Sequence, residues 1–331
     1  MKSERDIIAH VVSLLRLPPD GEVVRGIGDD CAVINKDSRN CFLVSTDTLV
    51  EGVHFDLAWH PPALVGRKAA AVNLSDIAAM GGKPRFALLN LAFPASAPTW
   101  LDDFLAGFIA MLGEYAVMLV GGDTVKSSSD CSITVTIIGE AARDAVIYRS
   151  GAVSGDLVFV SGVLGNAAAG LALCRAALGR NALQKWKGLV GAHQAPEPRI
   201  GLGNILAASN LVHAMMDISD GLATDLAHLC EESSTGAEVA RESLPVSEDL
   251  EAAAAELQMP VLDWVLRGGE DYQLLFTAAP EHEAALRALV REKNEGEIFA
   301  VGRITAGRGV FLQEGSKRSE ITYQGYDHFR D

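Results

Sequence analysis

The sequence has few of the features that mark secreted, membrane-bound or zinc-binding proteins. Its 331 residues include five cysteines, an odd number without a Cys-x-x-Cys pair, so neither a disulfide framework nor a zinc or dithiol site is indicated. No uncharged run of about 18 apolar residues occurs, and the N-terminus lacks the continuous apolar stretch of a signal peptide. We therefore expect a cytoplasmic protein with no segment in a membrane.

Positive charge is also scarce. Lys and Arg total 28 against 43 Asp and Glu, which gives a formal net charge of −15. A field of this sign repels nucleic acids and anionic membrane surfaces, so neither is expected as a partner. Hydrophobic residues make up 49% of the chain and charged residues 21%, which predicts well-filled cores and excludes disorder over most of the length.

Chain length and a stretch rich in glycine and serine divide the sequence into two parts. Domains usually contain about 100 to 200 residues, so 331 residues favour two. The stretch RSGAVSGD at 149–156 precedes a new strand–turn–helix pattern, and we place the boundary there, with domains over 1–150 and 151–331.

Apolar spacing predicts a mixture of helices and strands. Helices are expected at 3–16, 62–80, 99–116, 166–179, 199–208 and 222–233. Strands are expected at 31–34, 41–46, 86–93, 117–120, 133–140, 156–161, 212–216, 273–277, 298–304 and 309–313. The fold class is therefore α/β or α+β with two sheets.

Six motifs combine carboxylates with Gly, Ser or Thr. They are GIGDD (26–30), STDT (45–48), NLSD (73–76), GGDT (121–124), DISDG (217–221) and GGED (268–271). Any one of them is typical of a turn, because Asp caps turns and Gly adopts positive φ. Three of them directly follow an apolar run, where α/β proteins bind ligands. We therefore expect acidic loops at the ends of elements, gathered at one site.

Gathered carboxylates repel one another and take up protons unless a cation lies among them, so the motifs predict a divalent metal. The candidate ligands are Asp30, Asp47, Asp76, Asp123 and Asp217, with neutral oxygens from Ser45 and Thr46. Oxygen ligands favour Mg²⁺, Ca²⁺ or Mn²⁺ over zinc. Because an acidic protein can bind a polyanion through such metals, metal–nucleotide chemistry is indicated.

The familiar nucleotide-binding signatures are missing. The chain has no G-x-x-x-x-G-K-[ST] and no kinase H-R-D or D-F-G motif, which disfavours a P-loop enzyme or a protein-kinase fold. Gly162, Gly165 and Gly170 follow the strand at 156–161, but their spacing misses G-x-G-x-x-G. Close strand–helix packing explains these glycines better than a cofactor loop.

In chain order, the motifs resemble those of one family. They are GIGDDCA, STDTLVEGVHF, VNLSDIAAMGG, GGDT, RSGA, DISDGL, GGEDY and the terminal GYDHF. Over residues 3 to 329 the chain is similar to thiamine-monophosphate kinases of the aminoimidazole-ribotide synthetase superfamily. The resemblance implies the two-domain fold of that superfamily. In that fold, an N-terminal mixed sheet with helices is expected to bind ATP and Mg²⁺ and to form the dimer, and a C-terminal α/β sandwich is expected to complete the active-site cleft.

The resemblance also implies an activity, namely ATP-dependent phosphorylation of thiamine monophosphate to thiamine diphosphate in thiamine diphosphate biosynthesis. The implied cofactors are several Mg²⁺ ions and K⁺, and the implied assembly is a homodimer. A phosphate monoester has its second pKa near 6 and is already mostly dianionic at neutral pH. We therefore expect direct in-line transfer without a protein general base or a phospho-enzyme intermediate.

Individual residues receive roles by their place in these motifs. The implied metal ligands are Asp30, Ser45, Thr46, Asp47, Asp76, Asp123, Asp217 and Asp220. The implied ATP contacts are Tyr115, Gly122, Asp123, Arg149 and Ser219, and the implied thiamine-phosphate contacts are His54, Glu270 and Tyr323. Taken alone, Arg149 fits an exposed hinge arginine equally well and Tyr323 fits a core-packing tyrosine equally well, whereas His54 alone fits an ordinary loop histidine better. Glu270 has a second argument, because a carboxylate attracts a thiazolium and accepts hydrogen bonds from an aminopyrimidine.

Other functions remain open on the sequence alone. An aminoimidazole-ribotide synthetase is the nearest rival. A selenophosphate synthetase or a hydrogenase-maturation carbamoyl dehydratase fits less well, because Cys31 lies inside an acidic motif and the chain ends HFRD without a cysteine. A Ca²⁺-binding protein lacks the EF-hand spacing, and an NAD-dependent oxidoreductase rests only on the glycines after residue 161.

Overall fold

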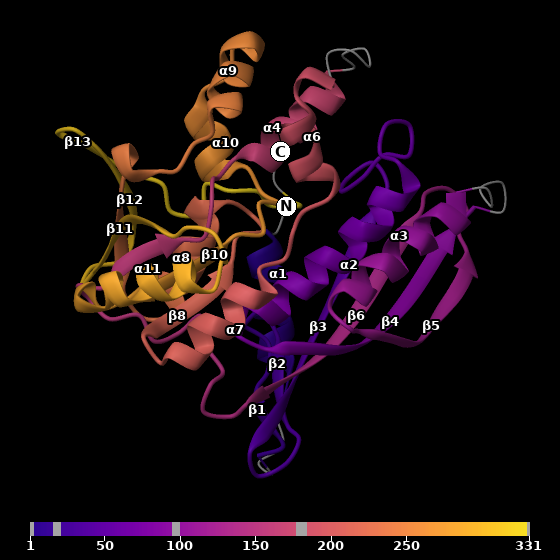
Figure 1. Cartoon of the computed structure of the whole chain (residues 1–331), viewed down its shortest axis with the longest axis horizontal. Helices are drawn as coiled ribbons and strands as arrows, with labels where there is room; N and C mark the ends of the chain where they lie inside the picture. The colour runs from indigo at the N-terminus through magenta and orange to yellow at the C-terminus, as the bar shows by residue number, and fades with distance from the viewer. Residues whose placement is uncertain (1–2, 16–20, 95–99, 177–183, 330–331) are drawn as a thin grey trace.

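The computed structural model describes residues 3–15, 21–94, 100–176 and 184–329, which form two mixed sheets with packed helices (Figure 1). Residues 16, 99 and 177–179, at the ends of three predicted helices, lie outside the described residues. The predicted class, α/β with two sheets, is confirmed. Among the described helices, none combines the length and the apolar character that crossing a bilayer requires.

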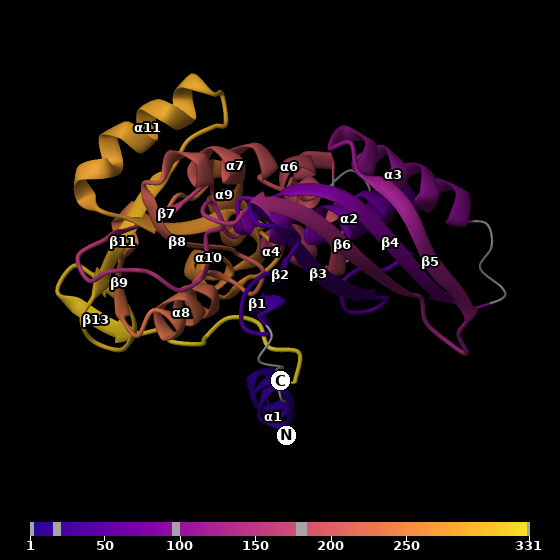
Figure 2. The same ribbon diagram turned by 90° about the horizontal axis from the view of Figure 1, so that it is seen from below.

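The first sheet has six strands in the order β1-β2-β3-β6-β4-β5. They are β1 (Val23–Arg25), β2 (Ala32–Asn35), β3 (Asn40–Val50), β4 (Lys83–Phe93), β5 (Met118–Lys126) and β6 (Ser132–Ala142). β4 and β5 pair in parallel, and the other neighbours are antiparallel. Helices α2 (Pro62–Ala79) and α3 (Leu101–Glu114) cover one face (Figure 2). Alternation in β3 places Leu43 and Leu49 toward the helices and Thr46 and Thr48 on the open face.

The second sheet has seven strands in the order β13-β12-β9-β11-β7-β10-β8. They are β7 (Leu157–Val160), β8 (Val212–Asp217), β9 (Gly236–Ala240), β10 (Leu274–Ala278), β11 (Phe299–Thr305), β12 (Gly309–Glu314) and β13 (Lys317–Glu320). β9 and β12 pair in parallel, and the other neighbours are antiparallel.

Helices pack on both faces of the second sheet, as an α/β sandwich requires. One face carries α4 (Asn166–Arg175), α6 (Lys187–Gln194), α8 (Leu222–Glu232), α9 (Glu248–Leu257) and α10 (Val261–Arg267), and the other carries α7 (Ile200–Ser209) and α11 (Glu283–Glu292). The split follows strand alternation, since Val158 and Val160 of β7 belong to one core cluster and Phe159 to the other. Figure 2 shows α11 and α8 on opposite sides of this sheet.

Helix α2 is buried on all sides and joins the two halves. Thirteen of its 18 residues are buried, because it packs against β3, β6 and α3 of the first half and against α7 and β8 of the second. Close approach depends on glycine: a Cβ at Gly107 of α3 would lie 1.9 Å from the carbonyl oxygen of Ala63, and one at Gly203 of α7 would lie 2.2 Å from that of Ala78. A single apolar cluster therefore runs through both halves.

The first and last described segments of the chain lie near each other (Figures 1 and 2). Helix α1 (Glu4–Leu14) begins with a capping box formed by Ser3 and Asp6, and the N–H of Glu4 donates to Asp327 of the C-terminal tail at 3.5 Å. No residue of α1 is buried, although its apolar spacing predicted the helix.

Two expectations from the sequence need correction. The acidic motifs are not all loops: Asp47 lies within β3, Asp76 within α2 and Asp123 within β5. The short glycine-rich stretch after β7 does mark close packing, but between two helices, because a Cβ at Gly170 of α4 would lie 2.0 Å from the Leu189 carbonyl oxygen of α6.

Candidate functional site

Carboxylates from both halves of the chain converge beside α2. Asp30 precedes β2, Asp76 lies on α2 and Asp217 ends β8, and these three side chains each place an oxygen within 4.8 Å of the others. Asp30 and Asp217 are buried and Asp76 is half-buried. The convergence predicted from the sequence is therefore present for these three motifs.

The core-facing side of β3 adds two further groups. The hydroxyl of Ser45 donates to Asp76 Oδ2 at 2.5 Å, and the N–H of Asp47 donates to the Asn73 side-chain oxygen at 3.1 Å. Asp47 also shares a hydrogen bond with Asp76, so the two carboxyls are neighbours. Ser75, next to Asp76 on α2, donates to Asp217. Asn73 and Ser75 belong to the VNLSD motif, yet the sequence analysis gave them no role.

The electrostatics of this cluster favour a cation. Burial, and next the neighbouring Asp30, raise the pKa of Asp217 to about 7. Burial and the repulsion from Asp47 and Asp217 raise the pKa of Asp76 well above its usual range. The Oδ2 atom of Asp30 is buried without a hydrogen-bond partner. Closely spaced carboxylates with raised pKa values and an orphaned oxygen fit a hard divalent ion such as Mg²⁺.

Arg149 supplies a positive charge to this cluster. Its Nη2 atom donates to Asp30 Oδ1 at 2.5 Å, and its backbone N–H donates to Asp29 Oδ1 at 3.2 Å. The side chain is 22% exposed and lies between β6 and β7, where the chain passes from one half to the other. It is therefore a partly buried partner of the acidic cluster, and the alternative of an exposed hinge arginine is wrong.

The loop after β8 places Ser219 and Asp220 at the edge of the cluster. Its backbone is bonded from two sides, since Asp220 N–H donates to Asp225 Oδ2 at 3.1 Å and Ser219 O accepts from Glu270 N–H at 2.8 Å. Burial, and next Glu4, raise the pKa of Asp220 to about 7. Buried Asp225 of α8 thus holds the loop through a backbone hydrogen bond.

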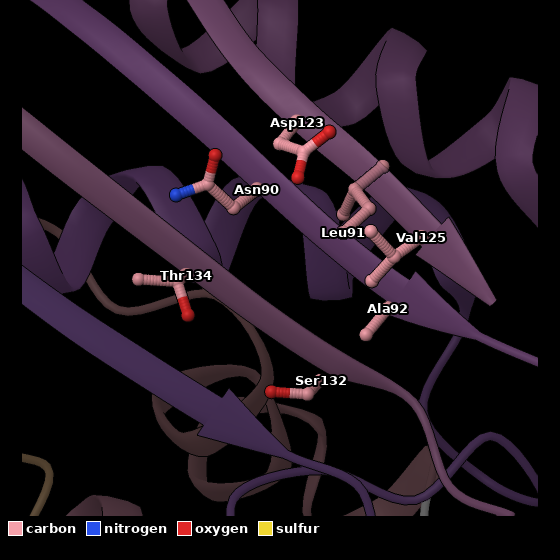
Figure 3. A pocket seen from close by; sticks show the side chains of 7 residues that line it. All are labelled: Asn90, Leu91, Ala92, Asp123, Val125, Ser132 and Thr134. Carbon is pink, nitrogen blue, oxygen red and sulfur yellow. The ribbon is translucent and has the colours of Figure 1, made fainter. Parts of the chain in front are cut away.

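Asp123 and Thr46 lie on the opposite, open face of the first sheet. Cross-strand register pairs Asp123 with Asn90 and Asn90 with Thr134, and Figure 3 shows these side chains lining one pocket of about 270 Å³. The Thr46 hydroxyl donates to the Val135 carbonyl oxygen at 3.1 Å. Within the described residues, the structure does not bring Asp123 or the Thr46 hydroxyl into the cluster of Asp30, Asp76 and Asp217.

Gly122 and Tyr115, two predicted nucleotide contacts, both have close contacts with other parts of the fold. Gly122 must be glycine, because a Cβ there would lie 1.8 Å from the Leu89 carbonyl oxygen of β4. Tyr115 ends α3, and its hydroxyl donates to the Pro198 carbonyl oxygen at 3.4 Å. It lies among Arg67, Glu114, Glu197 and Arg199 rather than among the clustered aspartates.

His54 and Glu270 meet at a buried lysine. Lys68 Nζ lies 2.5 Å from Glu270 Oε1 and donates to the His54 carbonyl oxygen at 3.0 Å. His193 Nδ1 lies 2.8 Å from Glu270 Oε2. Burial alone would raise the pKa of Glu270, but Lys68 and His193 outweigh it and lower that pKa to about 2. Lys68 therefore joins the two predicted substrate contacts, and His193 contacts one of them; neither Lys68 nor His193 was predicted to belong to the site.

The C-terminal tail brings Tyr326, rather than Tyr323, to this place. The Arg5 guanidinium lies over the Tyr323 ring, 3.5 Å from the ring centroid, and the Tyr323 hydroxyl bonds to Glu231. Its ring also packs edge-on against that of His228, so its contacts lie on α1 and α8. The Tyr326 ring lies 4.9 Å edge-on from that of His328, which lies 5.1 Å from His54. Tyr326 belongs to the GYDHF motif itself, and this was the signal that could have identified it.

Known proteins share this architecture along almost the whole chain. The family model of the AIR synthase related protein N-terminal domain matches residues 28–141, and that of its C-terminal domain matches residues 153–314. The chain belongs to the AIR synthase related family. A structure of the hydrogenase maturation protein HypE in complex with ATP is 20% identical with a TM-score of 0.70, over 87% of each chain, and shares the fold alone.

Within this family, the chain is similar to thiamine-monophosphate kinases. Those of Buchnera aphidicola subsp. Schizaphis graminum and Escherichia coli K12 are each 37% identical, over 94% and 93% of both chains respectively. The solved structure of AaThiL complexed with AMPPCP and TMP is 33% identical with a TM-score of 0.81, over 96% of each chain. The enzyme of Aquifex aeolicus is 32% identical with a TM-score of 0.79, over 93% of this chain and 95% of that one.

Proposed function

We propose that this chain transfers the γ-phosphoryl group of ATP to the phosphate of thiamine monophosphate, giving ADP and thiamine diphosphate. One observation carries the proposal: a buried acidic cluster with the donor set of an Mg²⁺ site lies next to the loops that present His54 and Glu270. Relatives of 37% identity are thiamine-monophosphate kinases, and a structure of the same fold was solved with AMPPCP and TMP.

The chain's task in this reaction is to bring two polyanions together. Asp30, Asp76 and Asp217, with Asp47 and Ser45, would hold the divalent ions, which supply charge neutralisation for the donor and acceptor phosphates. Arg149, beside Asp30, offers a guanidinium that suits a phosphate. No side chain needs to remove a proton, because the acceptor is already mostly dianionic at neutral pH.

Glu270, His54 and Tyr326 are suited to the thiamine end of the acceptor. The ionised Glu270 carboxylate accepts hydrogen bonds from an aminopyrimidine, and the aromatic ring of Tyr326 can lie against a heterocycle. Asp123, on the open face of the first sheet, and its neighbour Gly122 are assigned to the nucleotide through the GGDT motif. Asp123 then contributes from a different face of the sheet than Asp47.

We also propose a homodimer formed through the first sheet. All nine residues of β5, the edge strand, are exposed, and the exposed apolar side chains include Met118, Val120 and Val125. An uncovered edge strand with apolar side chains is a ready partner for a second copy. The five cysteines are free and buried, which agrees with the cytoplasm as the location.

The test is a direct assay of the product. Mg-ATP is incubated with thiamine monophosphate, with thiamine, or without acceptor, and thiamine diphosphate and ADP are quantified by chromatography. We expect both products in equal amounts with thiamine monophosphate and none without Mg²⁺, and replacing K⁺ by Na⁺ tests the expected potassium dependence. A folded protein that binds Mg-ATP without forming thiamine diphosphate contradicts the proposal.

A further inference from the structure

Glu270 is held from behind by two fully buried side chains. Lys68 contacts one carboxylate oxygen at 2.5 Å and His193 the other at 2.8 Å. The side chains of Lys68 and His193 have no exposed surface, whereas that of Glu270 is 19% exposed. Lys68 and His193 therefore close one side of Glu270, and the exposed part of the side chain lies on the other, where a carboxylate oxygen can accept hydrogen bonds.

The charge of Lys68 is not explained by packing. It lies in α2, whose other buried residues are small or apolar apart from Asn73 and Ser75. Burying an ammonium and a carboxylate costs desolvation energy, and an apolar side chain of similar size commonly replaces such a pair without loss of stability. The pair has a further effect here, because the same Nζ also bonds the His54 carbonyl oxygen at 3.0 Å. Lys68 thus ties two separate loops of the site to one atom.

The backbone around Glu270 is also fixed. Glu270 has φ 70° and Tyr272 has φ 48°, in the left-handed region that side chains rarely adopt. This conformation is held by hydrogen bonds of 2.8 Å from Glu270 N–H to Ser219 O and from Tyr272 N–H to Ile218 O. The loop therefore fixes the backbone position of Glu270, and Lys68 and His193 fix the position of its carboxylate.

We infer that Lys68 and His193 are positioning residues that hold the Glu270 carboxylate in one place. There it accepts a hydrogen bond from the amine of the phosphate-accepting substrate and attracts that substrate's cationic ring. This inference rests on the proposed function, in which Glu270 contacts thiamine monophosphate. Lys68 acts through Glu270 and also fixes the His54 loop. His193 can do so as a neutral imidazole, because its Nδ1 atom lies 2.8 Å from Oε2.

The test is a double-mutant cycle on Lys68 and Glu270. Steady-state kinetics are measured for the wild type, Lys68→Met, Glu270→Gln and the double variant, with thiamine monophosphate and ATP varied in turn. We expect Lys68→Met to raise the KM for thiamine monophosphate about ten-fold or more, which corresponds to the loss of one charge-assisted hydrogen bond between Glu270 and the substrate. The kcat and the KM for ATP are expected to change by less than about three-fold. Because Lys68 acts mainly through Glu270, the double variant is expected to be no worse than Glu270→Gln alone.

Controls separate this role from a merely structural one. Lys185→Met breaks an exposed Lys–Glu pair of the same 2.5 Å length, with Glu256, and is expected to leave all constants unchanged. If Lys68→Met fails to fold, His193→Gln gives the same measurement. The inference is overturned if the effects of Lys68→Met and Glu270→Gln on KM add in the double variant. It is also overturned if Lys68→Met lowers kcat and raises both KM values by the same factor. An unchanged KM in Glu270→Gln refutes the proposed substrate contact instead, and an inactive wild type refutes the proposed function.

Discussion

Individual side chains of the acidic cluster favour metal binding and lower the stability of the metal-free protein. Asp30, Asp76 and Asp217 lie close enough to repel one another, and the hydroxyls of Ser45 and Ser75 and the guanidinium of Arg149 offset part of this repulsion. Groups arranged in this way lower the stability of the protein without metal and are compensated when a cation binds. Substitutions here should therefore separate activity from stability.

Asp76→Asn is the sharpest such substitution. The amide keeps the shape but loses a ligand charge, so we expect turnover to fall about 100-fold or more, the scale of several kcal/mol of lost charge stabilisation. The melting temperature in EDTA should stay equal or rise, because the amide, unlike the carboxyl, cannot ionise and repel Asp47 and Asp217. Asp103→Asn, on the exposed first turn of α3, is the control and should keep full turnover. Near-normal turnover of Asp76→Asn at saturating Mg²⁺ would show that Asp76 is not a metal ligand.

The raised pKa values predict how metal and pH act together. Asp217 and Asp220 have folded pKa values of about 7 against an ordinary value of 3.8, both raised first by burial. Between these pH values the folded state binds more protons than the unfolded state, so the free energy of unfolding without metal should fall as pH rises. Mg²⁺ competes with those protons and should stabilise more at high pH.

The measurement is thermal unfolding with Mg²⁺ and with EDTA at pH 6, 7 and 8. We expect the rise in melting temperature on adding Mg²⁺ to be larger at pH 8 than at pH 6. Ca²⁺ and Mn²⁺ serve as comparison ions, since both also take oxygen ligands. An equal rise at all three pH values would mean that the metal does not displace these protons.

At the scale of elements, sequence patterns located most helices and strands but not their surroundings. The expected helix at 62–80 matches α2, because Pro62 and Gly81–Gly82 bound it. Its lack of an amphipathic stripe reflects burial between two sheets, which no local pattern reveals. The strand expected at 117–120 continues to residue 126, since an edge strand accommodates the glycines that looked like a turn. Helices α6, α9, α10 and α11 were not predicted, although Ser247 caps α9.

The candidate site shows the same limit. Motif residues such as Asp30, Asp76 and Asp217 could be grouped because each stands in a distinctive local pattern. Lys68 could not, because a lone lysine in a helix is usually at the surface, and its partner Glu270 is distant along the chain. Asp123 was predicted beside the other carboxylates, but strand alternation places it on the open face.

The α2–α3 contact provides a test at this scale. A Cβ at Gly107 would overlap the Ala63 carbonyl, so Gly107→Ala should push the helices apart and destabilise the fold by about 1–3 kcal/mol or more. Gly113→Ala, on the same helix with no atom within 4 Å, should instead stabilise it by about 0.5–1 kcal/mol. Urea unfolding measures both. Equal effects of the two substitutions would contradict a close helix contact.

For the whole molecule, the exposed β5 edge predicts how two copies meet. Val120→Lys places a charge near the start of this strand, where Val120 is 56% exposed in the single chain. We expect this variant to be monomeric in sedimentation velocity at concentrations at which the wild type is dimeric. Met259→Lys, at an exposed apolar position in the second half, should stay dimeric. A dimeric Val120→Lys would place the interface elsewhere.

The apolar cluster that runs through both halves has a consequence for the evolution of the gene. Val33 and Leu43 of the first sheet belong to the same core as Leu206, Phe276 and Leu286 of the second half. Each half made alone would leave the α2–α7 seam, where Gly203 meets Ala78, open to water. Recombination between related genes at codons 149–156 would join halves with mismatched seams and produce chimaeras that fold poorly. We therefore expect the two halves to be inherited together, and substitutions along the seam to occur in complementary pairs.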